Sequence, residues 1–483
     1  MSIKKQILYF FVTAAVVFFS AWQGFAAAIN RYVATNGAHL SPFTNWSMAG
    51  TNISVVVSWA NSNNAGDTVW VSNGVYLLDD QINVTNTQVK GWSGNYADTI
   101  INGNNYAGKP VTNRCFYLNN TSALVAGLTI SNGFTLEQYA GAGLYICYGT
   151  VSNCLITDNV ASNPAAIGAS GGGGIFLDYS GKVVACVVRN NSSKRHGTGQ
   201  QGGGGIDMWS DDGQVLDSII ETNSSSYVSG GIRIRVKGMV SNCVIRGNST
   251  STHGGGLYIQ DGGRVYNSTI INNRVSDSTG AGVSAVKNVL VQNCIIVSNV
   301  GSGANTYGGG VCPAGGTNNI LRNCVVAQNT AAYGGGIGVR YGPVTCLVEN
   351  CSIASNRATV YGGGLYVTNA VFTVKNTIIY FNIATTGGSN WFLDAGSAVV
   401  FSNCCLSPTN DIVGSGNIAG DPQLVNLTGG NLRLHSDSPC VNAGLNQDWM
   451  TNSYDLDGRM RVRYGTVDIG AYETIYEGTI YKF

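Results

Sequence analysis

The sequence contains few charged residues and few prolines. Charged residues make up 11% of the 483 residues, whereas an ordinary globular domain has roughly 25%. The 26 basic and 25 acidic residues nearly cancel to a formal charge of +1, so the chain has no field that would attract nucleic acid or anionic lipid. We therefore expect no nucleic-acid partner.

Metal-ligand spacings are also missing. The sequence has no paired CxxC or HxxxH motif, and its four histidines, His39, His196, His253 and His435, are far apart. The stretch GGGGIDMW at 202–209 matches a calcium-binding nonapeptide once, without the tandem copies that build such a site. We expect no metal site and no cofactor; calcium stays open, but no pattern supports it.

Long apolar runs are absent except at the N-terminus. Lys4 and Lys5 precede an apolar run at 7–19, and Ala26 and Ala28 follow in the small-x-small arrangement of a cleavage site. We predict a signal peptide at 1–28, hence a secreted protein, extracellular or at the cell surface, with no integral membrane segment after cleavage. The alternative is an uncleaved anchor, but the run is shorter than the roughly 20 residues that span a bilayer.

What the chain does contain is a repeat built on glycine. Three consecutive small residues, mostly glycines, recur at intervals of 24 to 31 residues, and such a period predicts a solenoid. The third glycine of each copy is assigned to Gly143, Gly174, Gly205, Gly231, Gly256, Gly282, Gly310, Gly336, Gly364 and Gly388.

Each copy contains two short strand patterns. After the glycines, aliphatic residues alternate with others, as Leu257 and Ile259 do, which predicts a half-buried strand. A second pattern, N-(C/S/T)-x-I-x-x-N, follows, as in NCVIRGN from Asn242. Its final asparagines should stack at one corner and bond one another along the axis. They are Asn159, Asn248, Asn273, Asn299, Asn329, Asn356 and Asn382.

Cysteine recurs at one inward position of the second strand. The cysteines there are Cys154, Cys186, Cys243, Cys294, Cys324 and Cys351. Neighbouring parallel strands lie about 4.7–4.9 Å apart with aligned Cβ vectors, whereas a disulfide needs Cβ atoms roughly 3.5–4.5 Å apart and turned together. We predict mostly free thiols in a core stack.

These motifs resemble known secreted proteins. The repeats resemble right-handed parallel β-helix proteins of the pectate-lyase-like kind and are similar to chlamydial polymorphic outer-membrane repeats. The blocks DPQLVNLTGGNLRLHSDSPCVNAG, DLDGRMR and VDIGAYE resemble the choice-of-anchor Q segment of secreted bacterial proteins. No sorting tail follows Glu473, which leaves the mode of anchoring open.

The expected fold is all-β: a single-stranded right-handed parallel β-helix of eleven to thirteen coils, capped at both ends. The expected organisation is a signal peptide at 1–28, an N-terminal cap and first coils at 29–110, repeats at 111–408 and the choice-of-anchor Q-like segment at 409–483.

One face gathers groups able to act on or bind a sugar. The alternation places these side chains outward on successive coils: Asp178, Asp207, Trp209, Arg233, Arg235, Tyr258 and Gln260. If the protein is an enzyme, a polysaccharide lyase or glycoside hydrolase, Asp207, Arg233, Arg235 and Asp178 are the candidate catalytic residues. Trp209, Tyr258 and Gln260 are the candidate glycan-binding residues.

The simpler interpretation is a solvated Asp207–Arg233 cross-strand pair without chemistry. We favour it, and expect a monomeric binding scaffold for a polysaccharide or a cell-surface glycan.

Overall fold

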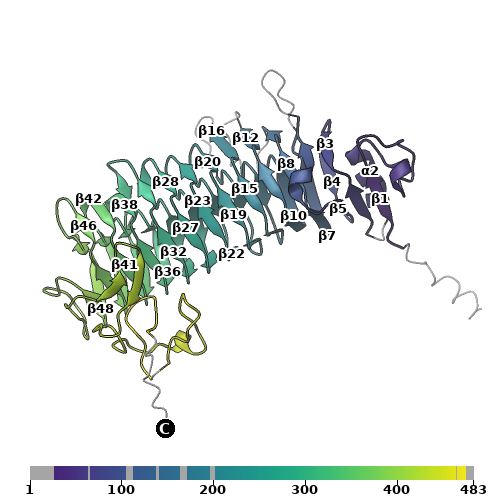
Figure 1. Cartoon of the computed structure of the whole chain (residues 1–483). Coiled ribbons are helices and arrows are strands. Elements are labelled where there is room, and N and C mark those ends of the chain that lie inside the picture. The colour runs from purple at the N-terminus through teal and green to yellow at the C-terminus, as the bar shows by residue number, and fades with distance from the viewer. Residues whose placement is uncertain are drawn as a thin grey trace, which may run out of the picture.

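Three parallel sheets wind together into an elongated solenoid (Figure 1). The computed structural model describes residues 27–63, 66–104, 113–136, 141–163, 171–195, 202–463 and 465–474. Most of the predicted signal peptide, with Lys4 and Lys5, lies outside the described residues, as does His196. No helix in these ranges is long and apolar enough to cross a bilayer.

Sheet I, with 24 strands, receives two strand segments from most coils, separated by a short turn that we call the bend. Its strands are β1 Asn30–Val33, β2 Thr68–Val71, β4 Ile82–Val84, β5 Gln88–Gly91, β7 Phe116–Ala126, β10 Leu144–Ser152, β13 Ile175–Leu177, β14 Lys182–Val184, β17 Ile206–Met208, β18 Gln214–Leu216, β21 Ile232–Ile234, β22 Met239–Ser241, β25 Leu257–Asp261, β26 Arg264–Tyr266, β30 Val283–Lys287, β31 Leu290–Gln292, β35 Val311–Pro313, β36 Gly316–Arg322, β39 Ile337–Gly338, β40 Val344–Glu349, β43 Leu365–Val367, β44 Ala370–Lys375, β47 Trp391–Leu393 and β48 Ala398–Ser402.

Sheet II has 13 strands, one per coil, which agrees with the expected eleven to thirteen coils. Its strands are β3 Gly74–Leu77, β6 Thr99–Asn102, β8 Thr129–Ser131, β11 Leu155–Thr157, β15 Val187–Arg189, β19 Ile219–Glu221, β23 Val244–Arg246, β27 Thr269–Ile271, β32 Ile295–Val297, β37 Val325–Ala327, β41 Ser352–Ala354, β45 Ile378–Tyr380 and β49 Cys405–Leu406.

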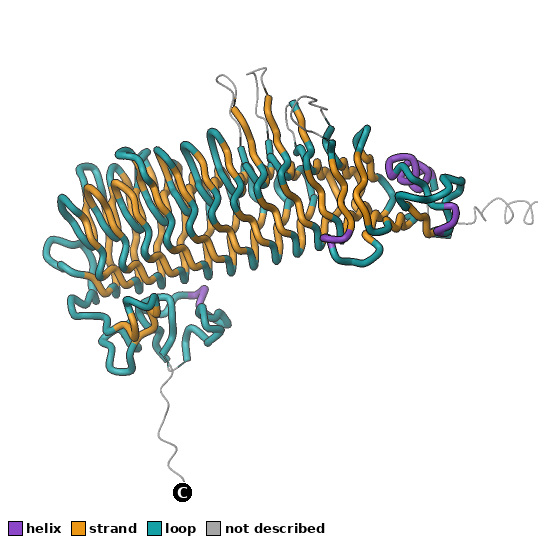
Figure 2. Tube along the Cα trace, turned by 45° about the horizontal axis from the view of Figure 1, so that its top comes forward, coloured by secondary structure: helices purple, strands orange, loops and turns teal. Residues whose placement is uncertain are grey.

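Sheet III has 12 short strands. A strand of this sheet comes just before the glycine tract of the next coil. Its strands are β9 Phe134–Thr135, β12 Val160–Asn163, β16 Ser192–Arg195, β20 Ser224–Ser225, β24 Ser249–Thr250, β28 Arg274–Val275, β29 Ser278–Thr279, β33 Val300–Gly301, β34 Thr306–Tyr307, β38 Thr330–Tyr333, β42 Arg357–Tyr361 and β46 Ile383–Ala384. Figure 2 shows the strands of successive coils stacked in register.

One continuous core fills the solenoid. The aliphatic pairs predicted to face inward are buried, for example Leu257 and Ile259 on β25, and Ile232 and Ile234 on β21. Their strands pair in parallel with Ile232 opposite Leu257. The predicted all-β parallel solenoid is therefore confirmed.

A ladder of asparagines runs along the corner between sheets II and III. In the middle of it, Asn273 Nδ2 donates to Asn299 Oδ1 at 3.0 Å and to the Ile245 carbonyl at 2.9 Å. The series extends the predicted one by Asn191 and Asn223, which link Asn159 to Asn248. These amides are buried, so the ladder satisfies groups that would otherwise be unpaired.

The glycine tracts lie where the backbone of the next coil passes. A Cβ on Gly256 would lie 2.8 Å from the Gly282 carbonyl oxygen and 3.0 Å from Asn273 Nδ2. The assignment of Gly388 as the last third glycine was wrong, because Leu365 N bonds to the Asn390 carbonyl as Leu257 N bonds to that of Gly282. Asn390 therefore occupies the third position in the last glycine tract.

All 13 cysteines are buried free thiols. The predicted ladder continues to Cys404, whose sulfur contacts the Val374 carbonyl at 3.3 Å. Burial raises the pKa of the Cys243 thiol to about 12, so this thiol stays neutral and packs as a small apolar side chain.

Both ends of the solenoid are covered by non-repeat segments. At the N-terminal end, α2 Ile53–Ser62 packs Ile53, Val56 and Val57 into the core, with η1 Trp46–Met48 beside it. At the other end, Val413 and Ile418 form bridges with the last coil.

The chain then turns back along sheet II (Figure 1), forming the antiparallel pair β50 Leu424–Asn426 and β51 Asn431–Leu434. The remaining short helices are η2 Tyr96–Asp98 and η3 Asp448–Met450.

Candidate functional site

Asp207 lies at the centre of the face that the sequence singled out. Its position on β17 is opposite Arg233 on β21, as predicted. Its carboxylate, however, accepts from Arg235 Nε at 3.0 Å and Arg235 Nη2 at 2.6 Å. Asp207 is 0% exposed and Arg235 is 8% exposed. The predicted solvated Asp207–Arg233 pair is therefore wrong in environment, because both residues are buried, and the hydrogen bonds of the Asp207 carboxylate come from Arg235.

Arg233 is buried beside this pair. Its Nε and Nη2 donate to Gln260 Oε1 at 3.2 and 2.8 Å, and its guanidinium lies 5.8 Å from the Tyr258 ring centre. Burial lowers the pKa of Arg233 to about 10, a value that still leaves the group charged at neutral pH. Arg233 and Gln260 are thus hydrogen-bonded across adjacent coils.

Tyr258 packs against the imidazole of His253. The His253 ring stacks on Tyr258 with centroids 5.5 Å apart, and His253 Nδ1 lies 2.6 Å from Thr279 Oγ1. Burial, then Arg340 and Arg233, lower the pKa of His253 to about 4, so it is neutral at physiological pH. Tyr258 and Gln260 therefore contact protein groups, and neither lines one of the cavities described below.

The cover over the charged pair is glycine backbone. A Cβ on Gly171 would lie 3.1 Å from Asp207 Oδ2, and one on Gly202 would lie 2.3 Å from Arg233 Cδ. Side chains at these two positions are thus excluded, and the tract packs directly on the charges. Asp207 and Arg233 occupy outward positions of their strands, and the close approach of the glycine backbone explains why they are buried.

Asp178 and Trp209 line a small cavity of about 210 Å³ together with Tyr145 and Phe176. Tyr145 Oη donates to Asp178 Oδ2 at 3.2 Å. The Tyr145 and Phe176 centroids are 5.0 Å apart, and the Arg235 guanidinium lies 4.2 Å from the Trp209 ring centre. The buried Arg235 therefore packs against the Trp209 ring, while part of that ring remains accessible to solvent.

A second, larger cavity of about 320 Å³ lies next to it at the bend. It is lined by Tyr148, Tyr179, Ser180, Ser210, Asp211 and Asp212. The Tyr148 and Tyr179 rings are stacked, with centroids 5.0 Å apart and planes at 16°. Tyr179 is 54% exposed, so one ring face is presented to solvent.

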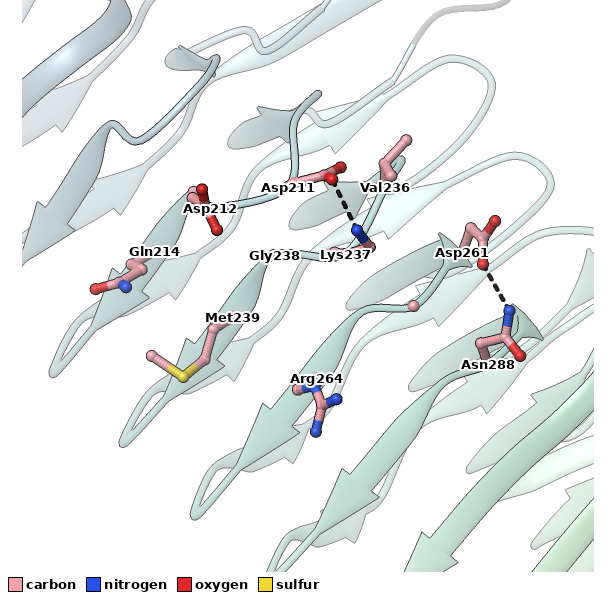
Figure 3. Close-up of a pocket in the computed structure, with 12 residues that line it drawn as sticks. Asp211, Asp212, Gln214, Val236, Lys237, Gly238, Met239, Asp261, Arg264 and Asn288 are labelled. Atoms are coloured by element: carbon pink, nitrogen blue, oxygen red, sulfur yellow. Dashed lines mark hydrogen bonds and ion pairs between the residues drawn. The ribbon is translucent and has the colours of Figure 1, made fainter.

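A third cavity, of about 530 Å³, continues along the bend and shares Asp211 and Asp212 with the previous one. Figure 3 shows its lining side chains on successive turns, with Asp211 near Lys237 and Asp261 near Asn288. We call these two joined cavities the axial groove. It crosses six successive coils, from Tyr148 to Asn288. The five steps between the first and the sixth coil measure about 24 Å at roughly 4.8 Å per step.

The charges of the axial groove are mostly paired. Lys237 Nζ lies 2.8 Å from Asp211 Oδ2, and Lys287 Nζ lies 2.9 Å from Asp261 Oδ2. The hydrogen bond to Asp211 raises the pKa of Lys237, and that from Asn288, then Lys287, lowers the pKa of Asp261. Both pairs are solvent-exposed, so their carboxylates can accept further hydrogen bonds.

Asp211 and Asp212 were not among the candidate residues taken from the sequence. The structure places both on a turn at the junction of the two cavities. A usable signal was present, since the residues after each glycine strand are polar or aromatic in consecutive copies. These turns read DYSG at 178–181, WSDDG at 209–213, RVKG at 235–238 and QDGG at 260–263.

The side chains that could ligate a metal ion are scattered over the described residues. Among the described residues, no three His, Cys, Asp or Glu side chains are grouped so that they could hold an ion. Lys237 and Lys287 are ion-paired with Asp211 and Asp261 of the axial groove, and these ammonium groups do not fit a cation site.

Residues 167–325 and 204–379 match the family model described as the right handed beta helix region. The fold is a right-handed parallel β-helix. No curated protein matches the sequence. Among solved structures, the β-helix is similar to pectate lyase Pel9A, with 14% identity, a TM-score of 0.42, and 94% of this chain and 98% of that chain covered.

Two further structures are similar at lower values. The PL6 family alginate lyase AlyGC has 11% identity and a TM-score of 0.41, with 92% of this chain and 59% of that chain covered. The pectin methylesterase PemA from Erwinia chrysanthemi has 10% identity and a TM-score of 0.24, with 81% and 94% covered. At such scores, the function of the β-helix has to be argued from its own side chains.

Proposed function

We propose that the protein is an exported polysaccharide-binding β-helix and that the axial groove holds the polymer. The observation that carries this proposal is the groove itself: stacked Tyr148 and Tyr179 at one end, and exposed carboxylates and amides along the rest. A pyranose ring stacks on an aromatic face and bonds through its hydroxyls, and the groove offers both kinds of contact.

The dimensions of the axial groove favour a chain over a single sugar. Ligand cavities have volumes of about 300–1,000 Å³, and the larger part alone has about 530 Å³. Its length of about 24 Å, at roughly 4.8 Å per coil, gives room for several linked sugars. The polymer would lie along the β-helix axis and cross each bend in turn.

The charge of the axial groove favours a neutral polymer. Three carboxylates, Asp211, Asp212 and Asp261, line it with two cations, Lys237 and Arg264. Lys237 is already paired with Asp211. A polyuronate would bring its own carboxylates against these, whereas sugar hydroxyls can bond the paired groups without a charge penalty.

The proposal is one of binding because the candidate catalytic charges do not line the axial groove. Asp207 is bonded to Arg235, and Arg233 to Gln260. Of the sequence-based candidates, Asp178 and Trp209 line the adjoining small cavity, where they would extend the contact surface.

The test uses residues 29–483, with Tyr179→Ala and Asp212→Ala as variants. Affinity electrophoresis and calorimetry would be run against xylan, mannan, galactan, polygalacturonate and alginate. We expect binding to a neutral polymer and a loss of about two- to tenfold in Tyr179→Ala, because an aromatic contact contributes about 0.5–1.5 kcal/mol. Asp212→Ala should also weaken binding.

Tyr454→Ala is the matched control, because Tyr454 is also 54% exposed and does not line the axial groove. An equal loss in both tyrosine variants, or no binding by the wild type, would overturn the proposal. The same samples would be assayed for reducing ends and for the ultraviolet absorbance of unsaturated products. Turnover would replace the binding function by a lyase or hydrolase activity.

Export has its own test. The protein recovered from the medium of the producing cell should begin at Ile29, as read by N-terminal sequencing. A chain that keeps Met1 and sediments with membranes would favour the uncleaved anchor.

A further inference from the structure

Four aromatic rings gather outside the core on the first coils. Tyr32 and Trp46 have centroids 4.6 Å apart, Trp46 and Trp92 are 5.0 Å apart, and Trp70 and Trp92 are 5.5 Å apart. Both indoles that contact Trp92 stand nearly perpendicular to it, at 85° and 86°. We call Tyr32, Trp46, Trp70 and Trp92 the tryptophan cluster.

Sheet I holds the tryptophan cluster in place. Tyr32 on β1, Trp70 on β2 and Lys90 on β5 are opposite one another in the parallel ladder. Trp70 Nε1 donates to Asn30 Oδ1 at 3.1 Å, which fixes the ring, and Lys90 Nζ lies 5.7 Å from its centre.

Trp46 is placed by η1. The side chain of Asn45 caps this short helix by accepting from Met48 N at 3.0 Å. The rings therefore come from separate segments that are each tied down, and they are pre-organised for a ligand.

The tryptophan cluster is not part of the core. Trp92 is 54% exposed, and it is followed by the polar, exposed Ser93 and Asn95. An aromatic side chain has about 150–250 Å² of surface, so the open part of Trp92 measures on the order of 100 Å². A stable protein interface buries about 800 Å² per partner. The exposed indole is too small for that and matches the face of a single sugar ring.

We infer that the tryptophan cluster is a second carbohydrate site, which stacks a neutral pyranose on Trp92 between the edges of Trp46 and Trp70. Asn30 and Lys90 at the rim offer polar atoms to the sugar hydroxyls. The ligand is the polymer class of the proposed function, but the inference has separate residues and can hold if the axial groove binds nothing.

The position of the tryptophan cluster connects it to the axial groove. β5 pairs with the second half of β7, and β7 pairs with β10, which carries Tyr148. Strand β5, which precedes Trp92, is thus two coils, or roughly 10 Å along the solenoid axis, from the coil where the axial groove starts. One polymer chain along sheet I can reach both sites, and two linked contacts raise the affinity for long chains far above that for short ones.

Trp92→Ala and its matched control Trp59→Ala test this inference. Trp59 is 46% exposed on α2 and contacts Phe43, so its ring lies outside the tryptophan cluster. Affinity for a long neutral polymer should fall at least tenfold in Trp92→Ala and stay unchanged in Trp59→Ala. Affinity for a tetrasaccharide should fall much less, because a short ligand occupies only one site.

Tryptophan fluorescence separates the two sites. The double variant Tyr179→Ala/Asp212→Ala should keep the fluorescence change caused by the tetrasaccharide, whereas Trp92→Ala should lose it. Failure of the double variant alone would count against the axial groove and leave the tryptophan cluster intact.

Three results would overturn the inference. They are an unchanged polymer affinity in Trp92→Ala, tighter binding of polygalacturonate than of any neutral polymer at this site, and binding of phosphatidylglycerol vesicles or self-association that Trp92→Ala abolishes.

Discussion

Single residues decide how the coils lock together. The side-chain amide of a ladder asparagine donates to a carbonyl of the preceding coil and to the asparagine of the next coil, as Asn248 does with the Ile220 carbonyl and with Asn273. The sequence motif predicted most of this series, but Asn191 and Asn223 were missed because their copies begin with Ala185 and Asp217. The six-residue spacing to the final asparagine holds in both.

Replacing Asn273 by alanine should therefore lower stability. The change removes a donor and an acceptor between two coils, and each buried partner left without a bond costs about 1–3 kcal/mol. Urea unfolding would measure the loss. Asn305→Ala is the control, since Asn305 is exposed on a loop, and the two variants should differ clearly.

Breaking a buried ion pair should cost more stability than breaking an exposed one. Asp207→Ala would leave Arg235 buried without its carboxylate, and breaking such a pair costs about 3–5 kcal/mol. Asp211→Ala breaks the exposed pair with Lys237, where the cost is about 0–1 kcal/mol. Denaturation midpoints would compare the two, and similar midpoints would contradict the burial of Asp207.

Sequence alternation could predict the side of the sheet on which Asp207 and Arg233 lie, but not what covers them. The cover is the backbone of Gly171 and Gly202, and a glycine tract carries no side-chain pattern from which its path could be read. The exposed Asp211 and Asp212 were missed for the opposite reason, because a turn position alone does not indicate a cavity.

Thiol chemistry should also follow burial. In the folded protein all 13 cysteines are buried free thiols, and burial raises the pKa of Cys115 and Cys404 to about 12. At pH 8 these groups stay protonated, and the thiolate is the reactive form. A chromogenic disulfide reagent should find no thiol in the native protein and 13 in denaturant.

At the scale of the element, the glycine tract and the strand after it form one unit. The tract lies flat against the next coil, and the strand then sets the inward and outward positions. The repeat period predicted both features, whereas the end of the series could not be read from the glycines. In the last coil Ser389 and Asn390 replace the second and third small residues, because no complete coil stacks on them.

Gly256→Ala should consequently destabilise the β-helix. Its new Cβ would press on the Gly282 carbonyl and the Asn273 amide, and such overpacking costs about 1–3 kcal/mol. Gly387→Ala makes the same change where the nearest atom, in Tyr361, is 3.6 Å away. Thermal unfolding followed by circular dichroism should show a lower midpoint for Gly256→Ala alone.

At the scale of the whole molecule, the C-terminal segment acts as a cover for one flank. Leu432, Ala471 and Tyr472 pack on Val325 and Ala354 of sheet II, and Leu434, Cys440 and Ile469 pack on Ile378 and Cys405. The buried Arg461 adds polar contacts, with Nη1 3.2 Å from Glu473 Oε1 and 3.3 Å from Asn323 Oδ1.

Removal of residues 421–483 should leave the coils formed but expose this apolar flank. We expect unchanged β-sheet circular dichroism, stronger binding of a hydrophobic fluorescent dye and a greater tendency to aggregate. Deletion of 1–28 alone provides the comparison. Loss of all β structure in the shortened protein would show instead that the segment is needed for folding.

Because the bend repeats from coil to coil, the length of the solenoid can change by whole coils. Each interior coil presents the same backbone partners to the coil before it and the coil after it, as β21 does between β17 and β25. Duplicating one complete period, such as residues 257–282, would therefore lengthen the molecule by about 4.8 Å and carry one more bend with it. The length of the axial groove is thus a quantity that evolution or an engineer can adjust by whole coils, while the two terminal segments remain as they are.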